Sequence, residues 1–197
     1  MADHPLRVLA VSGSLGKNSA VRSVLRLVGD KLRATGAHVD VLDLADEPLP
    51  PFNPDTAYLS LEYPGWKARV EQADVLLLGT PDYHGSISST LKNFLDHFWE
   101  EYAGKLFATI VASHDKGLTV SDQLRTVARQ CYAWSLPYAV AFGEKTDLKD
   151  GQIISDSFRS RVEMLVRDVR VYGELLARQR RHDLAGKEPG FLAKLRK

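Results

Sequence analysis

The sequence predicts an α/β fold, in which helices cover both faces of a largely parallel sheet. Leu6–Val11 and Asp74–Gly79 consist mostly of branched or small apolar residues, the pattern of strands that are buried on both faces. Between them, a strand, an amphipathic helix and a second strand follow one another with short connections, and such a unit forms a right-handed parallel crossover. The 197-residue chain has the length of one domain with a sizeable core, which we place at residues 1–185.

The first half of the chain divides into clear elements. After the strand Leu6–Val11 and a polar loop, a helix begins at Ala20, and Gly36 ends its apolar periodicity, as glycine does at helix ends. Val39–Leu44 is the second strand. The next segment, Glu47–Asp55, holds four prolines and shows no periodicity, so we expect a constrained loop.

The second half continues the alternation of helices and strands. The expected elements are a helix over Trp66–Gln72, a strand over Asp74–Gly79, a helix over Ser88–Tyr102, a strand over Lys105–Ala112, a helix over Ser121–Trp134 and a strand over Pro137–Phe142. Asp150 and Gly151 suggest a hairpin turn after the last strand, and Ser155 can cap the final helix. Residues 186–197 contain glycine, proline and charge, so we expect a loosely held tail.

The composition argues against several classes of partner. With 26 Lys+Arg and 25 Asp+Glu, the formal net charge is +1, so no overall field favours nucleic acid or an acidic membrane. The amino terminus lacks an apolar signal segment, and no run approaches ~18 apolar residues. Cys131 is the only cysteine, which excludes an intrachain disulfide and a cysteine-based metal cluster. We therefore expect a cytoplasmic protein that binds neither membrane nor nucleic acid.

A loop of small and hydroxylated residues follows the first strand and is the first candidate binding site. Its candidate ligand-binding residues are Ser12, Ser14, Gly16, Lys17, Asn18 and Ser19. The glycines let a ligand approach the main chain, the hydroxyls are donors, and Asn18 or Ser19 can cap the helix that follows. Because a helix amino terminus with free N–H groups attracts anions, the loop is suited to a phosphate.

Three kinds of phosphate loop compete for these residues. The nucleoside triphosphate loop fails, because Gly13 stands only three residues before Gly16 and Asn18 follows Lys17 where a hydroxyl is required. The dinucleotide loop lacks one of its glycines, although Asp43 at the end of the second strand is suited to a ribose. A mononucleotide loop of serines and backbone N–H groups, as used for FMN, fits best. An ordinary strand-to-helix turn with incidental serines is the remaining alternative.

Two further loops leave the same edge of the predicted sheet. Parallel strands place Thr80–Ser86 and Ser113–Gly117 at the carboxyl edge, where open α/β sheets bind ligands. The candidate ligand-binding residues of these loops are Pro81, Asp82, Tyr83, His84, Gly85, Ser86, Ser113, His114 and Lys116. Their rings and backbone N–H groups suit a flat polar ring system. The plain alternatives are that Tyr83 packs in the core and that His84 is a surface residue. A metal site is a further alternative, formed by Asp82, His84, His114 and Asp115.

Three motifs carry a resemblance to a known family. They are VSGSLGKNS after the first strand, LADEPLPPFNPD after the second and TPDYHGSISSTLKNFLD after the third. Over roughly residues 6 to 150, the sequence resembles the NADPH-dependent FMN reductases. This resemblance implies a flavodoxin-like three-layer sandwich, with helices on both faces of a five-stranded parallel sheet in the order 2-1-3-4-5. It also implies FMN bound at the three loops, NADPH or NADH as co-substrate, and assembly into homodimers or homotetramers.

The chain departs from the pattern of that family at three places. Gly16 stands where the phosphate loop usually carries an arginine, so Lys17 or Ser19 has to compensate. His84 replaces the usual asparagine after the tyrosine of the second loop. In the third loop, His114 and its neighbour replace a pair of glycines, which affects contacts to the pyrimidine edge of the flavin.

The resemblance implies an enzyme that passes hydride from reduced nicotinamide to FMN and on to a small acceptor, such as free flavin, a quinone or an azo compound. The protein aligns donor and acceptor and supplies N–H donors near flavin N1 and O2, which we expect from Tyr83–Ser86 and Ser113–Lys116. No protein acid or base is obligatory, so we assign no catalytic residue and no metal. The alternatives are a flavodoxin-like electron carrier that does not oxidise nicotinamide, and a dinucleotide-binding protein built on Asp43.

The aromatic residues of the helix Ser88–Tyr102 exceed what one sheet face can cover. Phe98 and Trp99 point about 100° apart on a helix, so at least one large ring is left outside the core. We expect a homo-oligomer with this helix and the loop Glu47–Asp55 at the contact. The alternative is that Trp99 packs under the terminal helix of its own chain.

Overall fold

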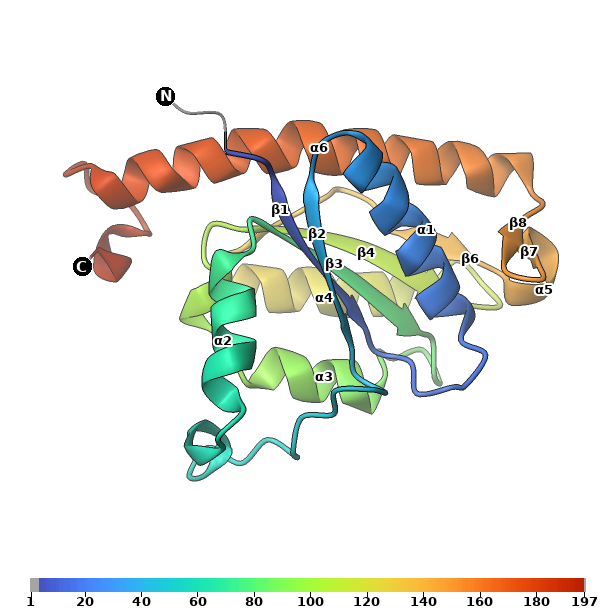
Figure 1. The fold of residues 1–197 in the computed structure, drawn as a ribbon, viewed down its shortest axis with the longest axis horizontal. Coiled ribbons are helices and arrows are strands. Elements are labelled where there is room, and N and C mark those ends of the chain that lie inside the picture. The colour runs from blue at the N-terminus through green and yellow to red at the C-terminus, as the bar shows by residue number, and fades with distance from the viewer. Residues whose placement is uncertain (1–3, 197) are drawn as a thin grey trace.

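In a computed structural model, which describes residues 4–196, a parallel sheet forms the centre of the molecule (Figure 1). Its strands lie in the order β2-β1-β3-β4-β5, and β6 also pairs with β4. Their bounds are β1 Arg7–Ser12, β2 His38–Asp43, β3 Val75–Pro81, β4 Leu106–Ala112, β5 Trp134–Ser135 and β6 Val140–Phe142. Every pairing among these strands is parallel. The order confirms the flavodoxin-like α/β fold expected from the sequence.

Helices cover both faces of this sheet. One face is covered by α1 (Ala20–Ala34) and α6 (Asp156–Ala185), and the other by α2 (Tyr63–Gln72), α3 (Ser89–Asp96) and α4 (Leu118–Gln130). Successive residues of each strand enter opposite cores: Val8 and Ala10 pack with α1 and α6, whereas Leu9 and Val11 pack with the other three helices. Two apolar cores explain why the central strands read as continuous apolar runs.

The fifth strand differs from the expected continuous strand over Pro137–Phe142. It is formed by two short pieces, β5 and β6, which both pair with β4 and are separated by residues 136–139. Proline has no N–H to donate to a neighbouring strand, so the ladder is interrupted where Pro137 lies. The preceding helix also ends earlier than expected, at Gln130, and Trp134 therefore belongs to the sheet rather than to α4.

The aromatic helix is likewise shorter than its apolar stripe suggested. Ser88 caps α3, which ends at Asp96, and the chain then forms a 3-10 turn over Glu100–Tyr102. The expected hairpin is present, because β7 (Leu148–Lys149) and β8 (Gln152–Ile153) pair antiparallel after the short helix α5 (Glu144–Asp147). Asp150 and Gly151 between them have φ of 51° and 76°, as a two-residue hairpin turn requires.

The carboxyl-terminal segment packs more closely than a loosely held tail. After α6, residues 190–196 include a 3-10 turn over Ala193–Leu195, and Leu192 is buried. The ring of Phe191 stacks on Tyr132 with centroids 6.1 Å apart. These two apolar side chains anchor a segment whose glycine, proline and charges alone suggested solvent. Within residues 4–196, no helix combines the length and apolar character that crossing a bilayer requires.

A buried lysine joins α2 to the start of β4. The Nζ atom of Lys105 lies 2.5, 2.7 and 2.5 Å from the carbonyl oxygens of Val70, Glu71 and Ala73, at the carboxyl end of α2. These carbonyls have no partner within the helix, so the amine satisfies groups that burial would otherwise leave unpaired. Burial, with a smaller contribution from Arg180, lowers the pKa of Lys105 from 10.5 to about 7.

The first prediction concerns the pH dependence of stability that Lys105 produces. Between pH 7 and 10.5 the unfolded chain binds one more proton at this residue than the folded chain, so the contribution of Lys105 to stability rises with pH. Lys105→Met is expected to destabilise the fold by roughly 2–3 kcal/mol at pH 7, because it leaves buried carbonyls unpaired. Urea unfolding of both proteins from pH 7 to 9.5 measures the difference. A difference that does not grow with pH contradicts the lowered pKa.

Candidate functional site

The first loop is fixed to the rest of the sheet edge through Gly13. Its N–H donates to the carbonyl of Gly79 at 2.8 Å, and its carbonyl accepts from the hydroxyl of Ser88 at 2.7 Å. A Cβ at this position would lie 2.7 Å from the Cβ of Leu91. Only glycine fits there, and the residue therefore holds the first loop against both β3 and the start of α3.

Beyond Gly13, the first loop offers unpaired donors. Within the described residues, none of the N–H groups from Ser14 to Asn18 donates a hydrogen bond. The Ser12 hydroxyl is buried and has no partner there either. Ser19 caps α1 by accepting from the N–H of Arg22 at 3.1 Å. It is one of the two residues, with Asn18, that the sequence indicated as the cap. Free N–H groups at the start of a helix form a site for an anion such as phosphate.

The remaining residues of the loop differ in exposure. Lys17 and Asn18 are exposed, whereas Ser14 is buried and its hydroxyl makes no hydrogen bond within residues 4–196. A Cβ on Gly16 would meet only the Ser14 hydroxyl, at 3.8 Å. The space around Gly16 is therefore open, and its lack of a side chain leaves room above the loop.

Arg22 is a member of this site that the sequence analysis missed. Its guanidinium pairs with both oxygens of Asp43 and also lies 3.4 and 3.2 Å from the carbonyl oxygens of Gly16 and Lys17. Asp43 ends β2 and is buried. Because its carboxylate is occupied by Arg22, it is not free to bind a ribose, which argues against the dinucleotide alternative.

The second loop is a tight turn after β3, whose last residue is Pro81. Tyr83 and Ser86 exchange two backbone hydrogen bonds, of 3.0 and 3.1 Å, around His84 and Gly85. The two central residues have φ of 56° and 74°, the left-handed conformation that glycine adopts freely and that Asn, Asp and His tolerate best among other residues. This explains why histidine can stand where the family pattern has asparagine.

Side chains also fix the second loop to its surroundings. Asp82 accepts from the N–H of Gly85 at 2.8 Å and from the hydroxyl of Ser113 at 2.9 Å, so it joins the second loop to the third. Gln123 of α4 accepts from the Ser86 hydroxyl and from the N–H of the next residue, both at 3.1 Å. The role of Gln123 was not visible in the sequence, because it depends on where α4 lies.

These hydrogen bonds leave few donors in the second and third loops. The N–H groups of Tyr83, Gly85 and Ser86 are engaged as described above, and in the third loop those of Ser113, Asp115 and Lys116 bond to Phe142, Ser113 and Asp115. Across the described residues of Tyr83–Ser86 and Ser113–Lys116, only His84 and His114 have N–H groups without a partner. The structure thus narrows the candidate backbone donors in these two segments to the N–H groups of His84 and His114.

The structure bears on two alternatives raised by the sequence: that Tyr83 packs in the core, and that the loops form a metal site. Tyr83 is 57% exposed, so it does not pack in the core. His84, His114 and Lys116 are also exposed. Among residues 4–196, no group of three or more His, Cys, Asp or Glu side chains is placed to hold a metal ion.

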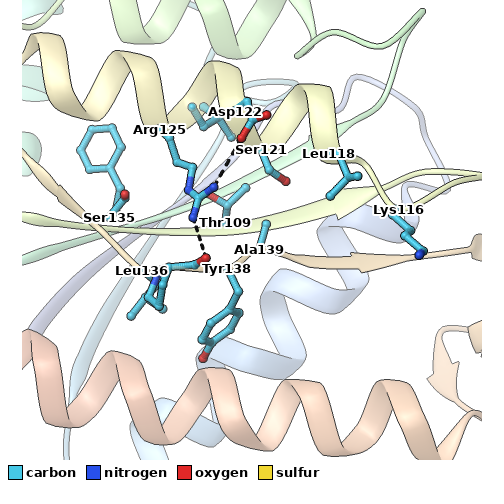
Figure 2. A pocket seen from close by; sticks show the side chains of 13 residues that line it. Thr109, Lys116, Leu118, Ser121, Asp122, Arg125, Ser135, Leu136, Tyr138 and Ala139 are labelled. Atoms are coloured by element: carbon cyan, nitrogen blue, oxygen red, sulfur yellow. Dashed lines mark hydrogen bonds and ion pairs between the residues drawn. The ribbon is translucent and has the colours of Figure 1, made fainter.

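A cavity of about 230 Å³ adjoins the third loop, between α4 and the break in the fifth strand (Figure 2). Arg125 crosses it from α4 and donates to the carbonyl of Pro137 at 2.6 Å. Tyr138 points the other way and donates to Asp168 of α6 at 2.8 Å. These two contacts hold the interrupted segment between the two helix layers.

Comparison with known proteins gives concordant results. The model of one family, described as NADPH-dependent FMN reductase, matches residues 6–147. A protein named FMN-dependent NADPH-azoreductase, from Staphylococcus haemolyticus, is 27% identical over 173 residues, which cover 82% of this chain and 92% of that protein. Among solved structures, the flavoenzyme NAD(P)H:(acceptor) oxidoreductase FerB from Paracoccus denitrificans has a TM-score of 0.70 and 19% identity, covering 88% of this chain and 98% of that one. A flavodoxin from the domain Archaea has a TM-score of 0.58 and 10% identity, covering 86% and 99%.

The second prediction tests the left-handed turn at His84. His84→Asn is expected to preserve stability and FMN binding, because asparagine tolerates this conformation and keeps the same N–H. His84→Val is expected to destabilise the fold by roughly 1–2 kcal/mol and to weaken FMN binding, because a β-branched residue is strained at positive φ. Thermal unfolding and FMN titration of both variants measure these effects. Equal behaviour of the Asn and Val variants contradicts the turn described.

Proposed function

Because this chain belongs to the NADPH-dependent FMN reductase family, we propose a position for each part of FMN on its three loops. The family is shown by the match of its model to residues 6–147, well over half of the chain. The protein is an FMN-dependent oxidoreductase that uses NAD(P)H. The observation that best supports the proposed positions is the set of unpaired N–H groups, which lies in the first loop and at His84 and His114.

The phosphate of FMN is assigned to the first loop, over Ser14–Ser19. The N–H groups there have no partner among residues 4–196, and the amino terminus of α1 adds its partial positive charge. The Ser14 hydroxyl and the exposed Lys17 supply further donors. Ser19 acts as the cap that the sequence analysis considered: its hydroxyl accepts from the helix, so it shapes the site and retains only its own proton for a ligand.

The flavin ring is assigned to the second and third loops. The N–H groups of His84 and His114 are the available backbone donors for its polar edge, and the Asp82–Ser113 hydrogen bond keeps the two loops together. The Tyr83 ring is exposed beside them and can lie along a flat ligand. Hydrogen bonding through the backbone does not depend on side-chain identity, so the two histidines keep the donors that the family pattern supplies with other residues.

When bound, FMN supplies the redox chemistry, by accepting a hydride from C4 of reduced nicotinamide at N5 and passing electrons to an acceptor. The chain itself binds, orients and shields. The carboxylates of Asp43 and Asp82 are each held by partners within the protein, so neither is free to act as a general base. This agrees with a reaction in which no protein acid or base is required.

The acceptor that these surroundings favour is a small flat molecule, such as free flavin, a quinone or an azo compound. Leu15, Tyr83 and Leu118 are large apolar residues with exposed side chains, and each lies in or next to one of the three loops. Such a rim suits an aromatic acceptor more than a charged one. The relatives named azoreductases agree with this class of acceptor.

The third prediction separates this enzyme from a flavodoxin-like carrier, whose fold is also similar. Purified protein loaded with FMN is expected to show flavin absorption that NADPH bleaches within seconds under anaerobic conditions. NADH, measured in parallel, reports the nucleotide preference. If flavin is retained but only a partner reductase bleaches it, the protein is a carrier. If no flavin is retained at micromolar concentration, the proposed positions on the loops are wrong.

Assembly into a homo-oligomer is also part of the proposal. Trp99 is 64% exposed, so it is neither in the core nor under the terminal helix of its own chain. Exposed Tyr58, Leu59 and Leu61 lie on the neighbouring segment, which rings of Phe52, Tyr63 and Phe98 connect to the end of α3. We call the four exposed residues Tyr58, Leu59, Leu61 and Trp99 the aromatic patch. Asn93 of α3 bonds to the N–H of Phe52 at 2.7 Å, so the proline loop and α3 present one surface.

The cellular compartment that we propose rests on the cysteine content. Its single cysteine, Cys131, is free and partly buried, as in proteins of a reducing compartment. A cytoplasmic location is therefore part of the proposal. The near-balanced charge of +1 supports the further proposal that neither nucleic acid nor an acidic membrane is a partner.

The fourth prediction tests the aromatic patch as the subunit contact. Trp99→Glu is expected to convert an oligomer to a monomer, because it places a charge in an apolar interface. Trp134→Glu is the matched control, since Trp134 is also exposed but lies on the edge strand β5. Light scattering at micromolar concentration measures the mass of each. A wild-type monomer, or dissociation by the control alone, contradicts this contact.

A further inference from the structure

We propose that Arg22 positions the first loop for phosphate, held in place by Asp43. This inference rests on the proposed position of the FMN phosphate. The guanidinium side chain is only 16% exposed, and the carboxylate it contacts is 8% exposed. A buried ion pair of this kind is expensive to form unless its remaining donors are satisfied. In Arg22, the remaining donor Nη1 reaches the carbonyl oxygens of Gly16 and Lys17.

The orientation of two peptide groups follows from these contacts. In a trans peptide the C=O and the following N–H point in opposite directions, and the chain has no cis peptide bond in its described part. The carbonyl of Gly16 points to Arg22, so the N–H of Lys17 points away from it. By the same argument, the N–H of Asn18 points away because the carbonyl of Lys17 faces Arg22. Arg22 thereby turns two donors outward, and these N–H groups have no partner of their own in the described chain.

Asp43 makes this arrangement rigid. Its carboxylate takes two guanidinium nitrogens, and one oxygen also accepts from the N–H of Ala45 at 3.2 Å. The pair ties the end of β2 to the first turn of α1, where Arg22 lies. A planar guanidinium can contact a carboxylate and two carbonyls at once, which a lysine ammonium cannot do with the same geometry. Arg22 thus fixes, from behind, the backbone of a loop in which Gly16 carries no side chain.

A specific measurement separates positioning from a general contribution to folding. FMN and riboflavin share the same ring and differ by the phosphate, so the ratio of their dissociation constants reports on the phosphate site alone. Arg22→Ala is expected to weaken FMN binding at least about tenfold, the equivalent of one lost hydrogen bond to a charged group, and to leave riboflavin binding nearly unchanged. Arg22→Lys is expected to recover only part of this loss. Fluorescence titration with each ligand measures both constants.

Two further variants complete the test. Arg26→Ala removes a positive charge from an exposed position of the same helix and is expected to leave the ratio unchanged. The double variant Arg22→Ala/Asp43→Asn is expected to bind FMN no more weakly than Arg22→Ala alone, because the two residues act as one unit.

The outcomes distinguish this inference from the proposed function. Wild-type protein that does not discriminate FMN from riboflavin contradicts both the phosphate position and the role of Arg22. Wild-type discrimination that survives in Arg22→Ala contradicts the role of Arg22 only. An equal loss of affinity for both ligands shows a structural role and also overturns the inference, as does full recovery of the ratio by lysine or a loss of the ratio in Arg26→Ala.

Discussion

The close contact at Gly13 is the constraint on which the site depends. One residue pairs with β3, accepts from the cap of α3 and leaves no space for a side chain. It therefore sets the direction in which the chain leaves β1, and with it the place where α1 begins. The carboxyl edge of the parallel sheet brings the three loops together, but this contact and the Asp82–Ser113 bond fix their relative positions.

The distribution of charge around the loops favours an anion. Three carboxylates lie in or beside the loops: Asp43 pairs with Arg22, Asp82 accepts from Ser113 and the N–H of Gly85, and the exposed Asp115 accepts from the N–H of Lys116. In the first loop, the N–H groups of Ser14–Asn18 have no partner among the described residues, and in the other two loops the same holds for His84 and His114. A phosphate and the polar edge of a flavin both need donors, and the chain supplies them from its backbone, which is already held in place before a ligand arrives.

Much of the fold could be predicted from the sequence, because local patterns determine it. Apolar runs predicted the central strands, and Asp150–Gly151 predicted the hairpin. Asn18 and Ser19 were both candidates for the cap of α1, and Ser19 is the cap. The errors arose where tertiary contacts override a pattern. The aromatic spacing continues past Asp96 although the helix does not, because rings can pack from a 3-10 turn as well as from a helix. Nothing local indicated that Phe191 would find Tyr132.

The position of three loops at the carboxyl edge of the sheet was also predictable, whereas the N–H groups within them that lack a partner were not. Which N–H groups are free depends on hydrogen bonds that local pattern does not reveal, such as the bond from Ser113 to the carbonyl of Phe142, and Arg22 was hidden in an ordinary helical pattern. The most direct measurement of the central claim is an amide NMR titration of the uniformly ¹⁵N-labelled protein with FMN. The account predicts large shifts for the N–H groups of Ser14–Asn18, His84 and His114, and smaller shifts for those of Gly85 and Ser86. Large shifts confined to other parts of the chain would contradict it.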